Sequence, residues 1–148
     1  MARPRIVLII TFSLLILGIA LFTISRRNRE PVQVFHAIVN RDCAPWDGSA
    51  FTVSVQYDSA TVIYISIWKS PDFIFPSTFS LPDETGQSGN AYILPELGLY
   101  TPLSGEVFFE RVERGKPIEG KFSLTSATGM KFEGWFIAEW GDQVVYCG

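Results

Sequence analysis

The stretch that indicates the fold most clearly is 118–140, which reads IEGKFSLTSATGMKFEGWFIAEW. Apolar and polar side chains alternate on both sides of a Gly-containing turn, and a period of two is typical of strands with one buried face. Phe122 and Leu124 share one face of the first strand, and Phe132 and Phe136 share one face of the second. We therefore predict an antiparallel hairpin here.

The same alternation extends to the rest of the soluble part. A second hairpin is predicted over 51–57 and 61–69, further strands over 105–113 and 144–147, and short edge strands over 77–81 and 91–94 in a Pro-rich stretch. Strands that recur about every ten residues between Gly-containing turns predict an all-β antiparallel sandwich or small barrel. The alternation does not distinguish a sandwich from a barrel.

An apolar stretch without ionisable side chains, Ile6–Ile24, precedes the soluble part. As a helix it would reach roughly 30 Å, which is the thickness of the hydrocarbon core of a bilayer. The stretch is longer than the core of a secretory signal and lacks a good cleavage site, which favours a retained signal-anchor over a cleaved signal. We expect four parts: a short tail over 1–5, a transmembrane helix over 6–25, a juxtamembrane connector over 26–42 and an extracytoplasmic β-domain over 43–148. Within the connector, the apolar residues between 32 and 39 could form a first strand or a turn of helix.

The orientation of this anchor depends on the two cysteines, Cys43 and Cys147, because arginines flank the apolar stretch almost equally at both ends. Two cysteines in an exported domain normally pair, whereas in a reducing compartment they stay free. We expect a Cys43–Cys147 disulfide, with two free thiols as the alternative. The expected location is therefore the cell membrane, in a single-pass arrangement with a cytoplasmic N-terminus and an extracytoplasmic C-terminal domain.

Charge is distributed unevenly along the chain. Residues 1–30 carry five arginines and one glutamate, whereas residues 31–148 carry seven basic and fourteen acidic side chains. The acidic part of the chain, residues 31–148, is repelled by nucleic acid and by anionic lipid headgroups. Nucleic-acid binding is therefore not expected.

No pattern of residues indicates catalysis. His36 is the only histidine, so it is the only histidine that could act as a base for a catalytic thiol. No spacing of His and Cys residues fits a zinc site. No Gly-rich phosphate loop follows a strand and opens a helix. The carboxylates of the strands fit polar, solvated strand faces. We expect no enzyme activity, no cofactor and no metal.

Outward-facing aromatic residues are the remaining candidates for function. If Ile63 and Ile65 are buried, the alternation turns Tyr64 and Trp68 outward. The same reasoning turns out Trp135 and Ile137. These four residues form the candidate interaction patch, unless a second layer covers them.

Two functions fit such a chain. The first is a non-catalytic, membrane-anchored interaction module or accessory subunit, with the bilayer and other membrane-protein subunits as its partners. The alternative is a tethered small barrel that binds a small ligand, either an apolar molecule or a glycan.

Overall fold

The strand-bearing part of the chain is one compact unit that starts at Gln33. The computed structural model describes residues 33–69, 74–83, 85, 87–94 and 100–147. The tail and the transmembrane helix expected over 1–25 lie outside these residues. Among the residues that are described, no helix is long and apolar enough to span a membrane.

The described part is all β, as predicted, and contains no helix. Its eight strands are β1 (Val34–Cys43), β2 (Ser49–Gln56), β3 (Val62–Ile67), β4 (Ser77–Leu81), β5 (Gly89–Ile93), β6 (Thr101–Arg111), β7 (Ile118–Ser126) and β8 (Lys131–Trp140).

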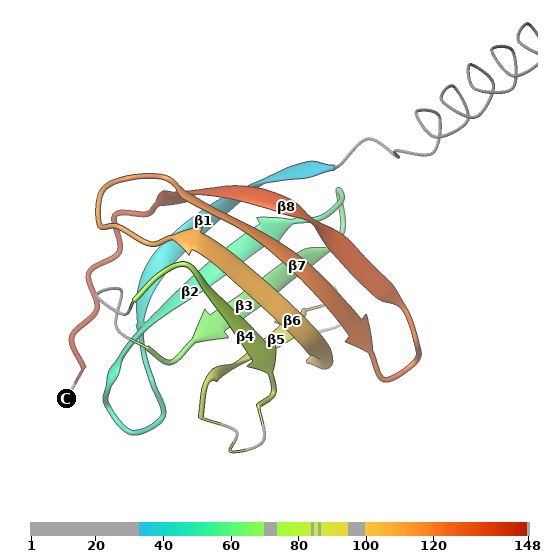
Figure 1. Ribbon diagram of the computed structural model, residues 1–148, viewed down its shortest axis with the longest axis horizontal. Helices are drawn as coiled ribbons and strands as arrows, with labels where there is room; N and C mark the ends of the chain where they lie inside the picture. Colours follow the sequence, from blue (N-terminus) through green and yellow to red (C-terminus); the bar gives the residue numbers. More distant parts are fainter. Residues whose placement is uncertain (1–32, 70–73, 84, 86, 95–99, 148) are drawn as a thin grey trace, which may run out of the picture. The chain divides into compact units, whose positions relative to one another are not determined.

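Seven of these strands form a closed ring in the order β1–β2–β3–β5–β6–β7–β8, and β8 pairs with β1 to complete it (Figure 1). The closing pair is parallel, with Val34 opposite Trp135 and Val39 opposite Trp140. The other strand pairs are antiparallel. Of the two predicted architectures, the barrel is therefore the one that forms.

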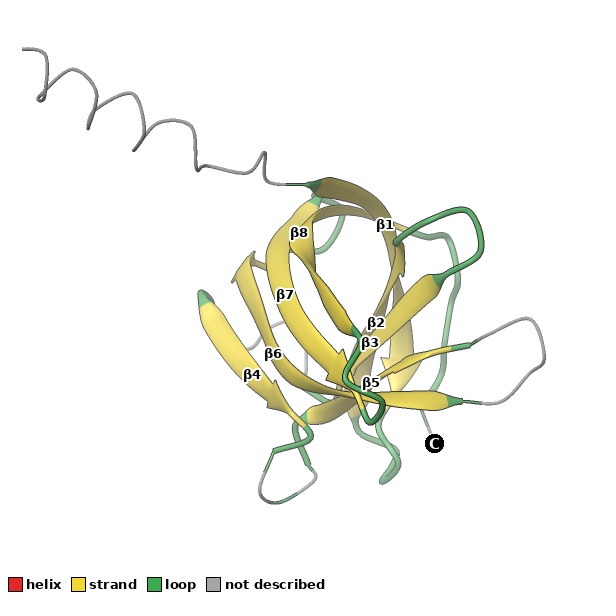
Figure 2. Ribbon diagram, turned by 90° about the vertical axis from the view of Figure 1, so that its right-hand side faces the viewer, coloured by secondary structure: helices red, strands yellow, loops and turns green. Residues whose placement is uncertain are grey.

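The eighth strand, β4, lies outside the ring and pairs with one half of β6 (Figure 2). One edge of β6 pairs with β7, whereas its other edge pairs first with β5, through Thr101–Leu103, and then with β4, through Gly105–Phe109. The short strand predicted over 77–81 is thus confirmed as an edge strand. The one predicted over 91–94 is not an edge strand, because β5 pairs with β3 on one side and with β6 on the other.

Two ends of the barrel differ from the predicted boundaries. β1 lies mostly within the stretch expected as a connector over 26–42, so the barrel begins about ten residues earlier than 43. Phe35 and Val39 of β1 point inward and are buried, which is why this segment belongs to the core. The strand predicted over 144–147 does not form, and residues 141–147 are held by a disulfide instead of a ladder.

The barrel interior is filled by inward-facing side chains from all seven ring strands. Phe109 lies at its centre and makes edge-to-face contacts with Phe51 and Phe136, at ring-centre distances of 5.4 and 5.6 Å. Such contacts add about 0.5–1.5 kcal/mol per pair to the effect of burial. The largest fully buried side chains are Phe51, Phe109, Phe136, Ile63, Ile65, Ile67, Leu81, Ile118, Leu124, Val39, Val53 and Val55.

Gly105 lies where β6 changes partner from β5 to β4, and its φ of 145° belongs to a region that L side chains rarely adopt. A Cβ atom added there would come within 2.1 Å of the Ser123 carbonyl oxygen. We expect Gly105→Ala to lower the free energy of unfolding by at least about 2 kcal/mol. Denaturant unfolding measures this loss.

Gly129 provides the matched control, because its φ of 85° is also positive but nothing lies within 4 Å of an added Cβ. Gly129→Ala should cost only the conformational strain, about 1 kcal/mol. Equal losses for the two variants would show that the close approach at Gly105 carries no extra cost.

Candidate interaction surfaces

The four residues predicted as one interaction patch lie on two sides of the barrel. Tyr64 lies on β3 and Trp68 directly follows it, whereas Trp135 and Ile137 lie on β8. β1 and β2 separate β3 from β8 in the ring. Each pair therefore has its own set of neighbours.

The first surface, which we call the apolar stripe, consists of Val34, Ile38, Trp135 and Ile137. These side chains are 56%, 54%, 37% and 41% exposed, respectively. Val34 on β1 is the register partner of Trp135 on β8. Ile137 lies opposite His36, and His36 lies between Val34 and Ile38 on the same face of β1. The stripe is therefore continuous across the seam at which β1 and β8 close the barrel.

Charged side chains border the apolar stripe. The Lys121 ammonium lies 5.9 Å from the centre of the Trp135 ring and 5.6 Å from that of Phe108, in cation–π contacts. Glu119 is the register partner of Ile137, and Glu139 is that of Ile38. An apolar centre with a charged rim is the arrangement found at protein–protein interfaces.

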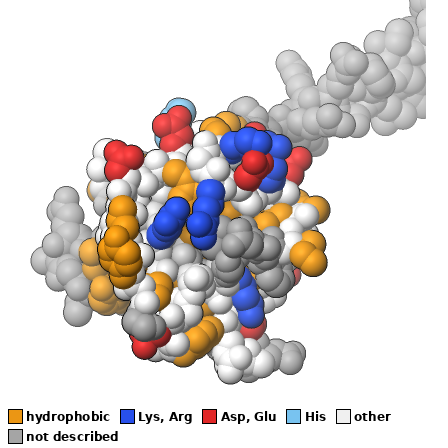
Figure 3. Space-filling model, turned by 90° about the vertical axis from the view of Figure 1, so that its left-hand side faces the viewer, with side chains coloured by type: hydrophobic (Ala, Val, Ile, Leu, Met, Phe, Trp, Pro, Cys, Tyr) orange, Lys and Arg blue, Asp and Glu red, His pale blue; other side chains and the backbone are white. Residues whose placement is uncertain are grey.

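Two hollows among the described residues open on the outside of the barrel. The larger, of about 460 Å³, lies beside the apolar stripe on β4, β6 and β7, and its lining includes Glu106, Phe108, Lys121 and Ser123. The other, of about 360 Å³, is lined by Glu110, Arg111, Pro117 and Glu119. Seen from the left-hand side of Figure 1, hydrophobic side chains form several separate groups with charged side chains between them (Figure 3).

The second surface, which we call the aromatic surface, consists of Trp46, Tyr64, Trp68, Tyr92 and Tyr100. Trp46 meets Trp68 edge to face at 5.6 Å between ring centres. Tyr64 and Tyr92, which are register partners on β3 and β5, stack at 5.1 Å, and Tyr100 meets Tyr92 edge to face at 4.9 Å. Trp46 is 53% and Tyr100 69% exposed, whereas the other three rings are half-buried.

A row of polar residues crosses the sheet between the two groups of rings. Thr52, Ser66 and Asn90 are register partners on β2, β3 and β5. The Thr52 hydroxyl donates to the Asp42 carboxylate at 2.6 Å, so the 2.9 Å contact between the Thr52 and Ser66 hydroxyls has Ser66 as its donor. The Asn90 side chain is exposed, and its amide makes no hydrogen bond to another described residue.

The electrostatics of the aromatic surface keep its central phenol protonated. Burial raises the pKa of Tyr92, and its neighbours Tyr100, Tyr64 and Asp42 raise it further. A neutral phenol keeps its O–H group as a hydrogen-bond donor.

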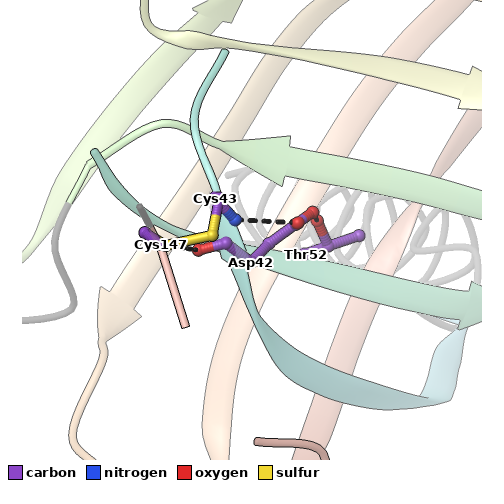
Figure 4. The surroundings of a disulfide bond; sticks show 4 residues. All are labelled: Asp42, Cys43, Thr52 and Cys147. Atoms are coloured by element: carbon purple, nitrogen blue, oxygen red, sulfur yellow. Dashed lines mark hydrogen bonds between the residues drawn. A yellow bond between two sulfur atoms is a disulfide. The ribbon is translucent and has the colours of Figure 1, made fainter. Parts of the chain in front are cut away.

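The predicted disulfide between Cys43 and Cys147 is confirmed, with its two Cα atoms 5.5 Å apart (Figure 4). It joins the last described residue to the end of β1, so the two ends of the barrel lie side by side. The backbone N–H of Cys43 donates to the Asp42 carboxylate at 2.8 Å. Asp42 thus connects the disulfide to the polar row.

Neither hollow brings His36 together with carboxylates. His36 lies on the exposed outer face of β1, opposite Ile137. Within the described ranges, no three His, Cys, Asp or Glu side chains are grouped as a metal site would require.

Several residues of both surfaces are absent from the predicted patch. Val34 and Ile38 lie in the stretch expected as a connector, although their alternation with buried Phe35 and Val39 is the signal of a strand. Tyr92 and Tyr100 join Tyr64 only through the pairing of β3 with β5, which sequence periodicity does not specify.

Comparison with known proteins gives no relative: no family model, no curated protein and no solved structure matches this chain.

Proposed function

We propose that this chain is a non-catalytic, single-pass membrane-anchored β-barrel that acts as an accessory subunit of a membrane complex. Its N-terminus is cytoplasmic and its barrel extracytoplasmic. The apolar stripe is the docking surface, and its partner is the extracytoplasmic part of another membrane protein.

The observation that carries this proposal is the exposure of four large apolar side chains in one continuous stripe with a charged rim. When a protein covers such a stripe, few favourable hydrogen bonds to water are lost, and burial of the apolar surface contributes hydrophobic free energy to binding. By contrast, the barrel interior is occupied by the protein's own phenylalanine and aliphatic side chains, which argues for docking on the outside.

The position of the stripe favours a partner in the same membrane. Val34 follows the expected membrane helix over 6–25 by nine residues, a span of at most about 30 Å. Glu119, Glu133 and Glu139 surround the stripe, and their negative charge disfavours anionic headgroups as the occupant. The disulfide supports an oxidising compartment for the barrel.

Photo-crosslinking in native membranes tests the proposal. A photoreactive phenylalanine analogue at position 137 of the full-length protein should give a discrete adduct with one membrane protein. The same analogue at position 59, in the exposed β2–β3 turn, should give none. Absence of any adduct from position 137, or equal adducts from both positions, would contradict docking through the stripe.

Trp135→Ala should weaken the association about tenfold or more, because a truncated tryptophan at the centre of an interface often costs more than 1.4 kcal/mol of binding free energy. Its effect on the free energy of unfolding should stay within about 1 kcal/mol, because the ring is only partly buried. Co-purification from mild detergent measures the first effect and thermal unfolding the second. An equally large loss of stability would mean that Trp135 is simply part of the core.

A further inference from the structure

We propose that the aromatic surface is a separate site that binds a neutral oligosaccharide. The sugar chain crosses β2, β3 and β5 over the row Thr52–Ser66–Asn90, with aromatic rings on either side. This site goes beyond the docking role of the apolar stripe and does not depend on it.

The arrangement of side chains distinguishes this site from a protein-docking surface. A protein interface has an apolar centre and a polar rim. Here the order is reversed, because the half-buried Thr52, the buried Ser66 beside it and the exposed Asn90 occupy the middle and the rings lie outside them. Sugars combine apolar C–H faces with a dense set of hydroxyl groups, so they need both rings and hydrogen-bonding groups at close quarters.

The spacing suits a narrow, ring-built ligand. Trp68 and Tyr64 flank Ser66 along the chain, each two residues away, or roughly 7 Å along an extended strand. The row itself advances by about 4.8 Å per strand across the sheet. Thr52 and Asn90 are the residues of the row that a sugar can reach, because Ser66 between them is buried and its hydroxyl is bonded to that of Thr52.

The site is held in shape before any ligand arrives. Tyr64, Tyr92 and Tyr100 hold one another, as do Trp46 and Trp68. The Asp42 carboxylate accepts from Thr52, and Ser66 donates to Thr52, so both hydroxyls already have fixed directions. Preorganisation reduces the entropy lost on binding.

Charge selects the class of sugar. Asp42 is the acidic side chain at the polar row, and the residues from 31 onward carry twice as many acidic as basic side chains. A uronic acid or a sulfated sugar would meet repulsion here, whereas a neutral sugar would not. Asn90 offers both a donor and an acceptor to hydroxyl or N-acetyl groups.

Titration of the full-length protein in detergent with cellohexaose, xylohexaose and chitohexaose tests the site, with tryptophan fluorescence and calorimetry as readouts. We expect saturable binding of at least one of them at micromolar to millimolar concentration. Trp46→Ala and Tyr100→Ala should each weaken binding about tenfold, and Asn90→Ala about threefold to tenfold. Trp135→Ala, on the apolar stripe, is the matched tryptophan control and should bind like the wild type.

Three outcomes would overturn the proposal. The first is no saturable binding of any neutral hexasaccharide by protein that retains the wild-type melting temperature. The second is wild-type affinity in Trp46→Ala and Asn90→Ala. The third is a protein adduct from a photoreactive group at position 46 in native membranes that none of the hexasaccharides displaces. None of these outcomes depends on whether position 137 is cross-linked, so the two sites are judged separately.

Discussion

Replacement of both cysteines, Cys43→Ser together with Cys147→Ser, should lower the free energy of unfolding by about 4 kcal/mol. The disulfide joins positions 104 residues apart, and a cross-link of that span removes much of the freedom of the unfolded chain. For a domain of this size the loss corresponds to a decrease in melting temperature of roughly 15–25 °C. Circular dichroism of the full-length protein in detergent measures the change.

A truncation separates the cross-link from the contacts of the C-terminal segment. A chain that ends at Gly141 and carries Cys43→Ser lacks both the bond and the segment over 142–148. Most side chains of that segment are exposed, so this variant should be about as stable as the double serine variant. If the double serine variant keeps a melting temperature close to that of the wild type, the disulfide contributes little to stability.

Truncation of the central ring of the barrel, Phe109→Ala, should cost about 3–5 kcal/mol. Phe109 is fully buried and contacts Phe51, Phe79 and Phe136 at ring-centre distances of 5.4, 6.0 and 5.6 Å. Its removal leaves a cavity that these rings cannot fill without leaving their own contacts. Denaturant unfolding should show a lower midpoint with an unchanged slope.

Phe108 is the matched control because it is the preceding residue on the same strand and points the opposite way. Its ring is half-buried on the outside of β6 beneath the Lys121 ammonium. Phe108→Ala should therefore cost about 1 kcal/mol. Similar losses for the two variants would contradict the inward and outward assignment of these rings.

Local patterns predict the individual hairpins well, because each strand has one face against the core and the other in water. The strand pairs over 51–69 and 118–140 follow from this alternation and from their turn residues. Burial of Ile63 and Ile65, and of Phe132 and Phe136, follows in the same way.

Closure of the barrel depends on a contact that no local pattern carries. β1 and β8 are about a hundred residues apart in sequence and pair in parallel, whereas alternation specifies only which face of each strand is buried. The sequence therefore leaves a sandwich and a barrel as equal alternatives. For the same reason, the sequence predicts one patch from Tyr64, Trp68, Trp135 and Ile137. In the structure, β1 and β2 separate the first two residues, at β3, from the last two, on β8.

The anchor and the cellular location remain predictions. The stretch expected to span the membrane, residues 6–25, lies outside the described residues. The disulfide is confirmed and supports the orientation, because paired cysteines persist outside reducing compartments.

The pairing of β1 with β8 constrains when the protein can mature during its synthesis. The first strand to leave the ribosome needs the last one as its neighbour, and Cys43 needs the penultimate residue, Cys147. Until β8 and Cys147 have been synthesised, one edge of β1 lacks its paired strand and the thiol of Cys43 lacks its disulfide partner. The barrel can therefore close, and the disulfide can form, only after β8 and Cys147 have both been synthesised.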